Sequence, residues 1–146
     1  MAKEADPRAK VPARAMTSEL ARRAANAAEE KAREFGHTIS VAVVDESGNL
    51  VYFCRGDTCS FITFETAKGK AVMAAGFRRP TSDYLAAARD NPAFWSGVGA
   101  KLDMIIGPGG HPITKNGVLI GGIGCGGALG EEDNLCAEAG AKAAST

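Results

Sequence analysis

The chain has few aromatic residues and no excess of charge of either sign. Aromatic side chains make up 6% of its 146 residues, and 17 basic residues balance 17 acidic ones. No long block of like charge occurs anywhere in the sequence. A protein that binds nucleic acid or an anionic membrane normally shows a basic face. The composition therefore argues against nucleic acid and membrane as partners.

Long hydrophobic runs are also missing. The first 16 residues mix Lys3, Lys10 and Arg14 with Pro7 and Pro12, and they contain no apolar stretch typical of a signal peptide. No segment approaches the roughly 20 apolar residues that cross a bilayer as a helix. We therefore expect a cytoplasmic protein, with a flexible arm over 1–16 and a single domain over 17–146.

The four cysteines show no spacing with a known chemical meaning. Cys54 and Cys59 are five residues apart, and Cys125 and Cys136 are eleven apart. Neither spacing matches a zinc knuckle, a redox CxxC pair or a haem attachment motif. We expect reduced thiols, at least two of which serve as small buried hydrophobic residues.

Small residues take the place of the missing aromatics. Alanine is abundant and the chain has 18 glycines, within a total apolar share of 45%. Such a core buries less apolar area per residue than one rich in leucine and phenylalanine. We therefore expect contacts between subunits of a homo-oligomer to supply part of the stability.

The first half of the chain predicts a helix, a hairpin and two further helices. Thr17 or Ser18 caps the first helix, which Gly36 ends. Short β-branched runs over 39–45 and 50–55 flank a turn and predict a β-hairpin. A helix follows from Ser60 to the residues before Pro80, then a short one from Thr81 or Ser82 to Arg89.

The second half predicts an irregular crossing, a second hairpin and a last helix. Phe94, Trp95 and the following glycines form the crossing, and residues 102–106 are either strand or turn. Asn-Gly at 116–117 between apolar runs is a strong hairpin signal. The last helix covers 131–144, with three acidic residues at its positive end. The predicted class is α+β, an antiparallel sheet with N- and C-terminal helices and a central helical crossing packed against it.

Two stretches of the sequence together resemble a known family. The first joins Ile39–Asp45 and Gly48 to Ala67-Lys68-Gly69-Lys70-Ala71 and Phe77–Thr81. The second joins Gly109–Ile113 and Gly117 to Ile120–Gly127, Asp133 and Cys136-Ala137. In the order and spacing of these pieces the chain resembles the GlcG/HbpS-like family, also called the haem-degrading domain family, from about Thr17 to Ala144.

The resemblance implies a profilin-like fold, assembly into dimers or larger rings and, in some relatives, binding of haem or iron. In other relatives it implies a place beside catabolic or cobalamin-related enzymes. The chain departs from the family pattern at three positions: His111 replaces an aliphatic residue, Cys125 a small residue or serine, and Cys54 a polar or charged residue.

Three residues carry the predicted chemistry. His111, fixed between two glycines and a proline, is a candidate haem-iron ligand or general base. Cys125 precedes a glycine pair and a helix N-terminus, where backbone N–H groups lower a thiol pKa, so it is either a nucleophile or a buried small hydrophobe. Asp133 is either a catalytic acid or a stabiliser of the helix start.

Further residues are predicted to bind the ligand. Lys70, Arg78 and Arg79 suit carboxylates, including haem propionates. Phe94 and Trp95 either line an apolar pocket or pack in the core. The backbone of Gly109, Gly110, Gly126 and Gly127 lines the site. Glu65 is a weaker candidate for an iron ligand or acid, and His37 is expected to be a solvated residue at a helix end.

Three functions follow from these residues. The first is a haem- or tetrapyrrole-binding protein that senses, stores or slowly degrades its ligand. The second is a catabolic hydrolase, isomerase or dehalogenase that acts on a small organic acid, with His111 as base and Cys125 as nucleophile. The third is an accessory subunit of a catabolic enzyme complex. Whether the protein is an enzyme stays open at this level.

Overall fold

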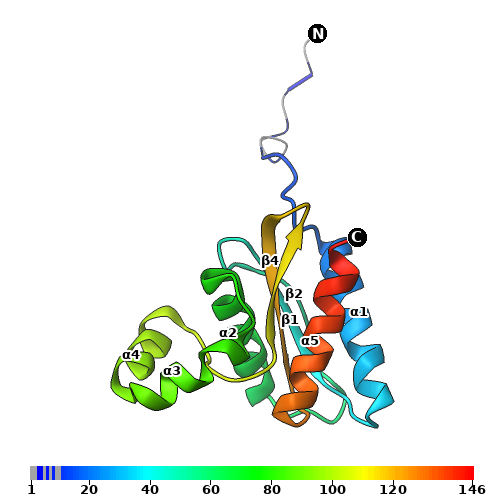
Figure 1. Cartoon of the computed structure of the whole chain (residues 1–146). Helices are drawn as coiled ribbons and strands as arrows, with labels where there is room; N and C mark the ends of the chain where they lie inside the picture. Colours follow the sequence, from blue (N-terminus) through cyan, green and yellow to red (C-terminus); the bar gives the residue numbers. More distant parts are fainter. Residues whose placement is uncertain (1–2, 5, 7, 9–10) are drawn as a thin grey trace.

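The fold is a four-stranded antiparallel sheet between two helical layers. The computed structural model describes residues 3–4, 6, 8 and 11–146. The strands are β1 (Ser40–Asp45), β2 (Leu50–Cys54), β3 (Gly110–Lys115) and β4 (Val118–Gly126), in the spatial order β2-β1-β4-β3. The helices α1 (Ser18–Glu34) and α5 (Gly130–Ala144) cover one face, and α2 (Ile62–Phe77) covers the other (Figure 1). The α+β prediction is confirmed.

Local signals place most of these elements. Thr17 caps α1, and its hydroxyl accepts a hydrogen bond of 3.1 Å from the Leu20 N–H. Asn116 and Gly117, between β3 and β4, have φ of 53° and 77°. Positive φ at both central residues defines the type I′ turn that the Asn-Gly pair predicts.

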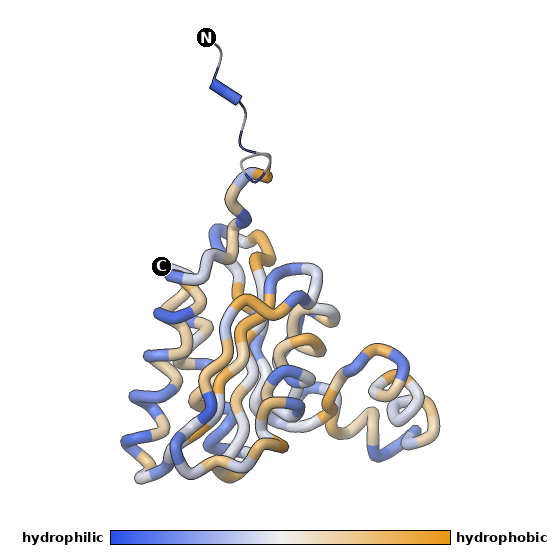
Figure 2. Tube along the Cα trace, turned by 180° about the vertical axis from the view of Figure 1, so that it is seen from behind, coloured by the Kyte–Doolittle hydropathy of each residue, from blue (hydrophilic) through white to orange (hydrophobic). Residues whose placement is uncertain are grey.

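The core has two parts, one on each face of the sheet. Val41, Val43 and Ile123 pack against the alanine stripes of α1 and α5. On the other face, Ala42 and Val44 pack against Ala67, Ala71 and Ala75 of α2. Figure 2 shows the central strands mainly in hydrophobic colours, whereas hydrophilic residues recur along the outer helices.

Glycines on β4 bring α2 unusually close to the sheet. A Cβ at Gly124 would collide with the Ala67 carbonyl oxygen, and one at Gly122 would lie 2.5 Å from the Ala71 carbonyl oxygen. Alanine faces these glycines from α2, so backbone meets backbone. The abundance of small residues therefore has a structural cause.

The segment between α2 and β3 differs from the prediction in its second part. The short helix predicted from Thr81 or Ser82 to Arg89 is present as a 3-10 turn over Thr81–Tyr84 that continues into α3 (Leu85–Asp90), whereas α4 (Pro92–Leu102) replaces the expected irregular crossing. Asn91 caps α4, and Pro92 occupies the first turn, where a proline costs no hydrogen bond. The glycines in this segment suggested irregular backbone, but the capping signal outweighs them.

The helices α3 and α4 extend together from the body of the fold beyond α2 (Figure 1). We call this pair of helices the arm, as distinct from the N-terminal residues 1–16. Neither helix contains a buried residue. Phe94 is 57% exposed, so the expected core role of this residue is wrong. Trp95 is half-buried against Phe77 and Tyr84, with ring centroids 5.7 and 5.4 Å away.

Part of the predicted N-terminal arm belongs to the core. Residues 11–15 are exposed, but Met16 is only 3% exposed and packs in the cluster between the sheet and α1. Residues 1, 2, 5, 7, 9 and 10 of that arm lie outside the described residues. Within the described part of the chain, no helix is both long and apolar enough to cross a membrane.

Candidate functional site

A buried lysine occupies the centre of the site that the sequence predicts. Lys70, on α2, is 9% exposed, and its Nζ donates a hydrogen bond of 2.8 Å to the Cys125 carbonyl oxygen. The same Nζ lies 3.5 Å from Asp133 Oδ2, on α5. Lys70 therefore joins α2 to β4 and α5 and is not a free cation for a ligand carboxylate.

Asp133 is held from both sides. Its Oδ2 faces Lys70, and its Oδ1 accepts a hydrogen bond of 3.1 Å from the Ala128 N–H before α5. Burial raises the pKa of this carboxyl, while Lys70 and the Ala128 N–H oppose the rise. Asp133 is therefore placed as a stabiliser of the start of α5 and not as a catalytic acid, because its carboxylate already accepts from the backbone donor that an anion would otherwise use.

The first glycine pair fits closely around this ion pair. Gly109 has φ of 120°, and a Cβ there would lie 3.1 Å from Lys70 Nζ and 2.8 Å from the Cys125 carbonyl oxygen. A Cβ at Gly110 would lie 2.5 Å from the Lys70 carbonyl oxygen. The Gly110 N–H donates to Thr81 Oγ1 at 3.0 Å. These glycines permit close packing and leave no room for a ligand beside Lys70.

Cys125 is fully buried on β4. Burial raises the pKa of its thiol well above the usual range, and the neighbouring Cys136 and Asp133 add to the rise. A buried thiol that resists ionisation is unsuited to nucleophilic attack. Its environment is that of the small buried hydrophobe, the other alternative for this residue.

The second glycine pair packs against neighbouring side chains and does not form an open anion cradle. A Cβ at Gly126 would lie 2.9 Å from Thr66 Oγ1, and one at Gly127 would lie 2.7 Å from Cys59 Sγ. Gly127 has φ of 113°, a conformation that favours glycine.

His111 lies on the edge strand β3, half-buried beside α5. Its Nε2 is 2.9 Å from Oδ1 of Asn134, on α5. The ring is thus held by a polar group of α5.

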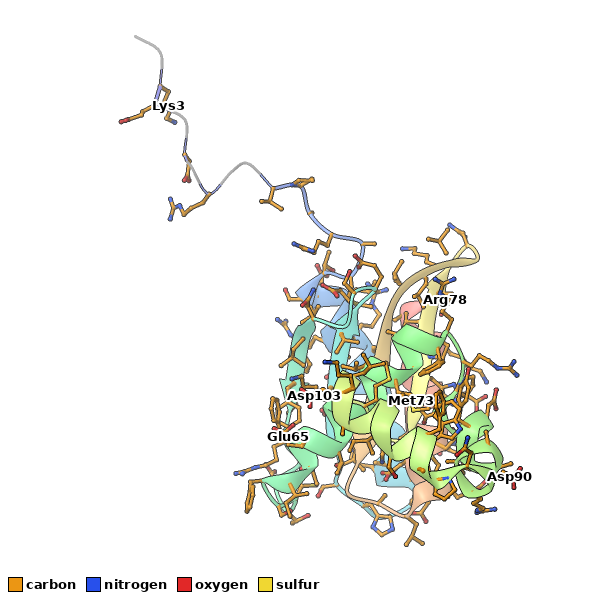
Figure 3. All side chains as sticks on the ribbon, turned by 90° about the vertical axis from the view of Figure 1, so that its left-hand side faces the viewer. Lys3, Glu65, Met73, Arg78, Asp90 and Asp103 are labelled. Carbon is orange, nitrogen blue, oxygen red and sulfur yellow. The ribbon has the colours of Figure 1, made fainter. Side chains whose placement is uncertain are left out.

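The other predicted ligand-binding residues lie apart from His111. Arg78, at the end of α2, borders a hollow with Thr114 and Gly117, near the β3–β4 turn and not at the His111 end of β3 (Figure 3). Arg79 is 65% exposed and pairs with Asp83 at 3.2 Å. Phe94 and Trp95 lie on the arm. The structure therefore does not bring these four residues into one site with His111.

A different hollow carries an open set of functional groups. It lies where α1 ends, β1 begins and β2 ends, with a volume of about 270 Å³. Its lining residues are Glu29, Arg33, His37, Thr38, Ile39, Cys54, Arg55, Gly56 and Asp57. We call it the His37 hollow.

The basic groups of the His37 hollow are available to a ligand. Arg33 and Arg55 are exposed, and neither takes part in an ion pair among the residues that the structure describes. Cys54 is half-buried, and burial together with the nearby Glu29 carboxylate raises the pKa of its thiol. The neutral thiol is therefore the resting form of Cys54.

The histidine of this hollow has a carboxylate partner. His37 Nε2 lies 3.0 Å from Glu132 Oε2, which connects the end of α1 to the first turn of α5. That Glu132 oxygen is buried and accepts no hydrogen bond among the described residues, although His37 Nε2 is only 3.0 Å away.

A buried hydroxyl holds the loop that closes the hollow. Ser40 accepts a hydrogen bond of 3.2 Å from the Gly56 N–H, and its Oγ is 2.7 Å from Thr63 Oγ1. The position of His37 at a helix exit after Gly36 predicts a solvated residue, and its side chain is 41% exposed while it also borders the hollow. Only the pairing of Val41 with Cys54 places residues 54–57 beside the end of α1.

Comparison with known proteins gives a consistent family. Residues 16–142 match the family described as haem degrading protein HbpS-like. A 15.0 kDa protein in the dhaT-dhaS intergenic region of Citrobacter freundii is 30% identical over 84% of this chain and 87% of its own length. Protein GlcG of Escherichia coli K12 is 32% identical over 67% of this chain and 71% of its own.

Solved structures share the whole fold. The crystal structure of HbpS is 33% identical with a TM-score of 0.79, covering 96% of this chain and 97% of that one. Protein ORFY of Klebsiella pneumoniae is 26% identical with a TM-score of 0.82, covering 94% and 96%. A PduOC:heme complex is similar in fold, at 24% identity and a TM-score of 0.78 over 88% and 94% of the two chains. The chain therefore belongs to the HbpS-like haem degrading protein family.

Proposed function

We propose that this protein binds haem or a closely related tetrapyrrole in the His37 hollow. The observation that carries the proposal is the presence around one opening of an imidazole, a thiol and two guanidinium groups that form no ion pair within the described residues. Membership of a family described by haem degradation supports the ligand class. Sensing, storage and slow degradation are the three roles compatible with such binding.

The donor set fits an iron porphyrin. Histidine and cysteine are both axial ligands of haem iron in proteins. A ligating histidine usually donates its other ring N–H to a carboxylate, which orients the ring and raises its basicity. Glu132 Oε2 is the carboxylate oxygen next to His37, 3.0 Å from Nε2, and it accepts no hydrogen bond among the described residues. His37 is therefore the residue that would hold the haem iron, with Cys54 beside it in the lining.

The two arginines of the lining suit the periphery of the ligand, whereas Glu29 and Asp57 carry the opposite charge. Arginine binds carboxylates through a planar pair of N–H donors, so Arg33 and Arg55 would hold the propionates. The buried Ile39 supplies an apolar wall. Ligand sites usually measure about 300–1,000 Å³, and the hollow measures about 270 Å³. It would thus hold one edge of the ring and leave the rest for solvent or a second subunit.

Bound haem would supply redox and oxygen chemistry at its iron. The protein groups would fix the ring and balance its carboxylates. His111 is the competing ligand that the sequence predicts. It has an amide partner in Asn134, but no guanidinium contacts its ring among the described residues.

The experiment exploits the fact that the chain has only two histidines. Haemin is titrated into the wild type, His37→Ala and His111→Ala, and the Soret band is followed by absorbance. We expect saturable binding of one haemin per chain that His37→Ala abolishes or shifts strongly and His111→Ala leaves intact. The converse result would keep haem binding but move the ligand to His111. A response of the wild type that never saturates would refute haem binding itself.

A second test concerns the carboxylate contacts. We expect Arg33→Ala combined with Arg55→Ala to weaken haemin binding while the position of the Soret band stays unchanged, because the axial ligand is intact. Arg79→Ala is the matched control, since Arg79 already pairs with Asp83. Equal affinity of the double variant and the control would remove the two arginines from the site.

The organic-acid enzyme is less well supported. Its proposed nucleophile, Cys125, is fully buried with a raised thiol pKa, and its carboxylate clamp lies apart from His111.

Homo-oligomeric assembly has a specific candidate surface in the arm. Helices α3 and α4 contain no buried residue, although they carry Phe94 and Leu102 at 57% and 50% exposure. Exposed apolar residues gathered on one element usually mark an interface. Part of the arm is therefore the proposed contact with a second copy of the chain.

A further inference from the structure

A second hollow lies between α2 and the inner side of the arm. Its volume is about 520 Å³, within the usual range for small-molecule sites. Its lining residues are Glu65, Trp95, Ser96, Gly99, Ala100, Asp103, Met104, Ile105 and Ile106. We call it the Trp95 hollow.

Close packing fixes the wall formed by residues 104–106. A Cβ at Gly69, on α2, would collide with Ile105, and one at Gly76 would lie 2.9 Å from Met104 Cε. On α4, a Cβ at Gly99 would lie 3.1 Å from the Met104 carbonyl oxygen. The apolar wall is thus held between two helices and is preformed, which lowers the entropic cost of binding.

The charged groups in this lining are both acidic. Glu65 projects from the first turn of α2, and Asp103 follows the end of α4 with φ of 56°. Neither carboxylate takes part in an ion pair within the described residues. Figure 3 shows the two residues near each other on one flank of the molecule, with Asp90 at the other. A cation would therefore be attracted to the hollow, and an anion repelled.

Trp95 adds an aromatic surface to the two carboxylates. The Trp95 ring packs against the rings of Phe77, Tyr84 and Phe94, whose centroids are 5.7, 5.4 and 5.3 Å away. These contacts hold the indole in place. Tryptophan is the side chain that binds organic cations best through its π face.

We infer that the Trp95 hollow binds a small organic cation, an alkylammonium group with an apolar body. The ammonium would lie between Trp95 and the carboxylates of Glu65 and Asp103, and its apolar part would contact Met104, Ile105 and Ile106. The same acidic lining disfavours haem, whose propionates are anionic, so this site is separate from the His37 hollow. The inference does not depend on the proposed haem function.

The arm can carry both this site and a subunit contact. Residues 95, 96, 99, 100 and 103 recur at helical spacing and line the hollow. Residues 94, 98 and 101 fall on the opposite side of α4 by the same 3.6-residue period. Phe94 is thus directed away from the hollow, and association through it leaves the hollow accessible.

The single tryptophan of the chain provides the readout. Choline is titrated into the full-length protein, and the intrinsic fluorescence is followed beside a titration with 3,3-dimethylbutan-1-ol, a neutral compound of the same shape. We expect a saturable change with choline only. An equal response to both compounds, or no saturable change with choline up to millimolar concentration, would overturn the proposal.

Variants test the two carboxylates. We expect Asp103→Asn and Glu65→Gln each to weaken choline binding about threefold to fivefold, since each removes one negative charge from an exposed position of the lining. Asparagine tolerates the left-handed backbone at position 103, so this variant should keep the fold. Asp90→Asn, an acid of the arm outside the hollow, should bind as the wild type does. Unchanged affinity in both hollow variants, measured by calorimetry with haem-free protein, would show that the carboxylates do not form the site.

Discussion

At the scale of single residues, the four cysteines separate into two classes by burial. Cys125 and Cys136 are fully buried, whereas Cys54 and Cys59 are half-buried near the end of the sheet. Iodoacetamide requires an accessible thiolate. We therefore expect native protein to be alkylated first at Cys54 and Cys59, as read by peptide mass spectrometry. Early modification of Cys125 would revive its role as a nucleophile.

The buried thiols also predict a dependence of stability on pH. Burial raises the pKa of Cys136 from 9.0 to about 11, with Asp133 and Glu132 contributing. The unfolded chain loses this proton near pH 9 while the folded chain keeps it, so stability falls as pH rises from about 9 to 11. One pKa unit corresponds to about 1.4 kcal/mol, which limits the loss from Cys136 to about 2–3 kcal/mol.

Urea unfolding at several pH values measures this loss. In Cys136→Ala the decline in stability between pH 9 and 11 should be smaller, because the Cys136 thiol is gone. The decline should not vanish, because Cys125, whose pKa is also raised, still contributes. A decline of identical size in the variant and the wild type would assign the effect to other groups.

The Lys70–Asp133 pair is a second feature at this scale. Removing one partner of a buried pair typically costs about 3–5 kcal/mol, because the other charge is left uncompensated. We expect Lys70→Met to lower the free energy of unfolding by this amount, measured with urea. The double variant Lys70→Met, Asp133→Leu should recover much of it. Losses that simply add would mean that the two charges are not coupled.

At the scale of elements, the contact between α2 and β4 depends on glycine. Gly124→Ala would force a Cβ into the Ala67 carbonyl oxygen, where the nearest atoms, from Ala67 and Ala71, are all backbone. Overpacking typically costs about 1–3 kcal/mol, and a backbone collision should reach the upper end of that range. Thermal unfolding should show a lower Tm.

Gly97 provides the matched control. It lies inside α4, and a Cβ there would meet nothing within 4 Å. Gly97→Ala should therefore raise stability by about 0.5–1 kcal/mol through helix propensity alone. A destabilised Gly97→Ala would indicate that α4 is covered by another chain at this position.

At the scale of the whole molecule, the arm formed by α3 and α4 buries no residue within one chain, although it carries exposed apolar side chains. Phe94→Ser should reduce the oligomeric mass measured by light scattering, because the side chain would lose its apolar contact with a second copy. Val11→Ser is the control, because Val11 is 68% exposed and lies outside α3 and α4. A monomeric wild type, or an unchanged mass in Phe94→Ser, would exclude this surface as the contact.

Much of the fold follows from local signals. The Thr17 cap, the two hairpins and the end of α2 before Pro80 are all present where the sequence predicts them. Each depends on residues adjacent in the chain. The helix α4 was missed because Gly97 and Gly99 weaken its helical pattern, although Asn91-Pro92 is a capping signal.

The candidate site depends on tertiary structure in a way that local signals do not reveal. The sequence by itself determined the α+β class and the small-residue core, because these follow from periodicity, turn residues and composition, and the resemblance of two stretches indicated the family. It also singled out Lys70, Asp133 and Cys125, but only the structure shows that they are buried together. The His37 hollow and the Trp95 hollow each join segments far apart in the chain. Strand register and helix packing alone decide which side chains share an opening, because they bring together residues that no motif or periodicity connects along the sequence.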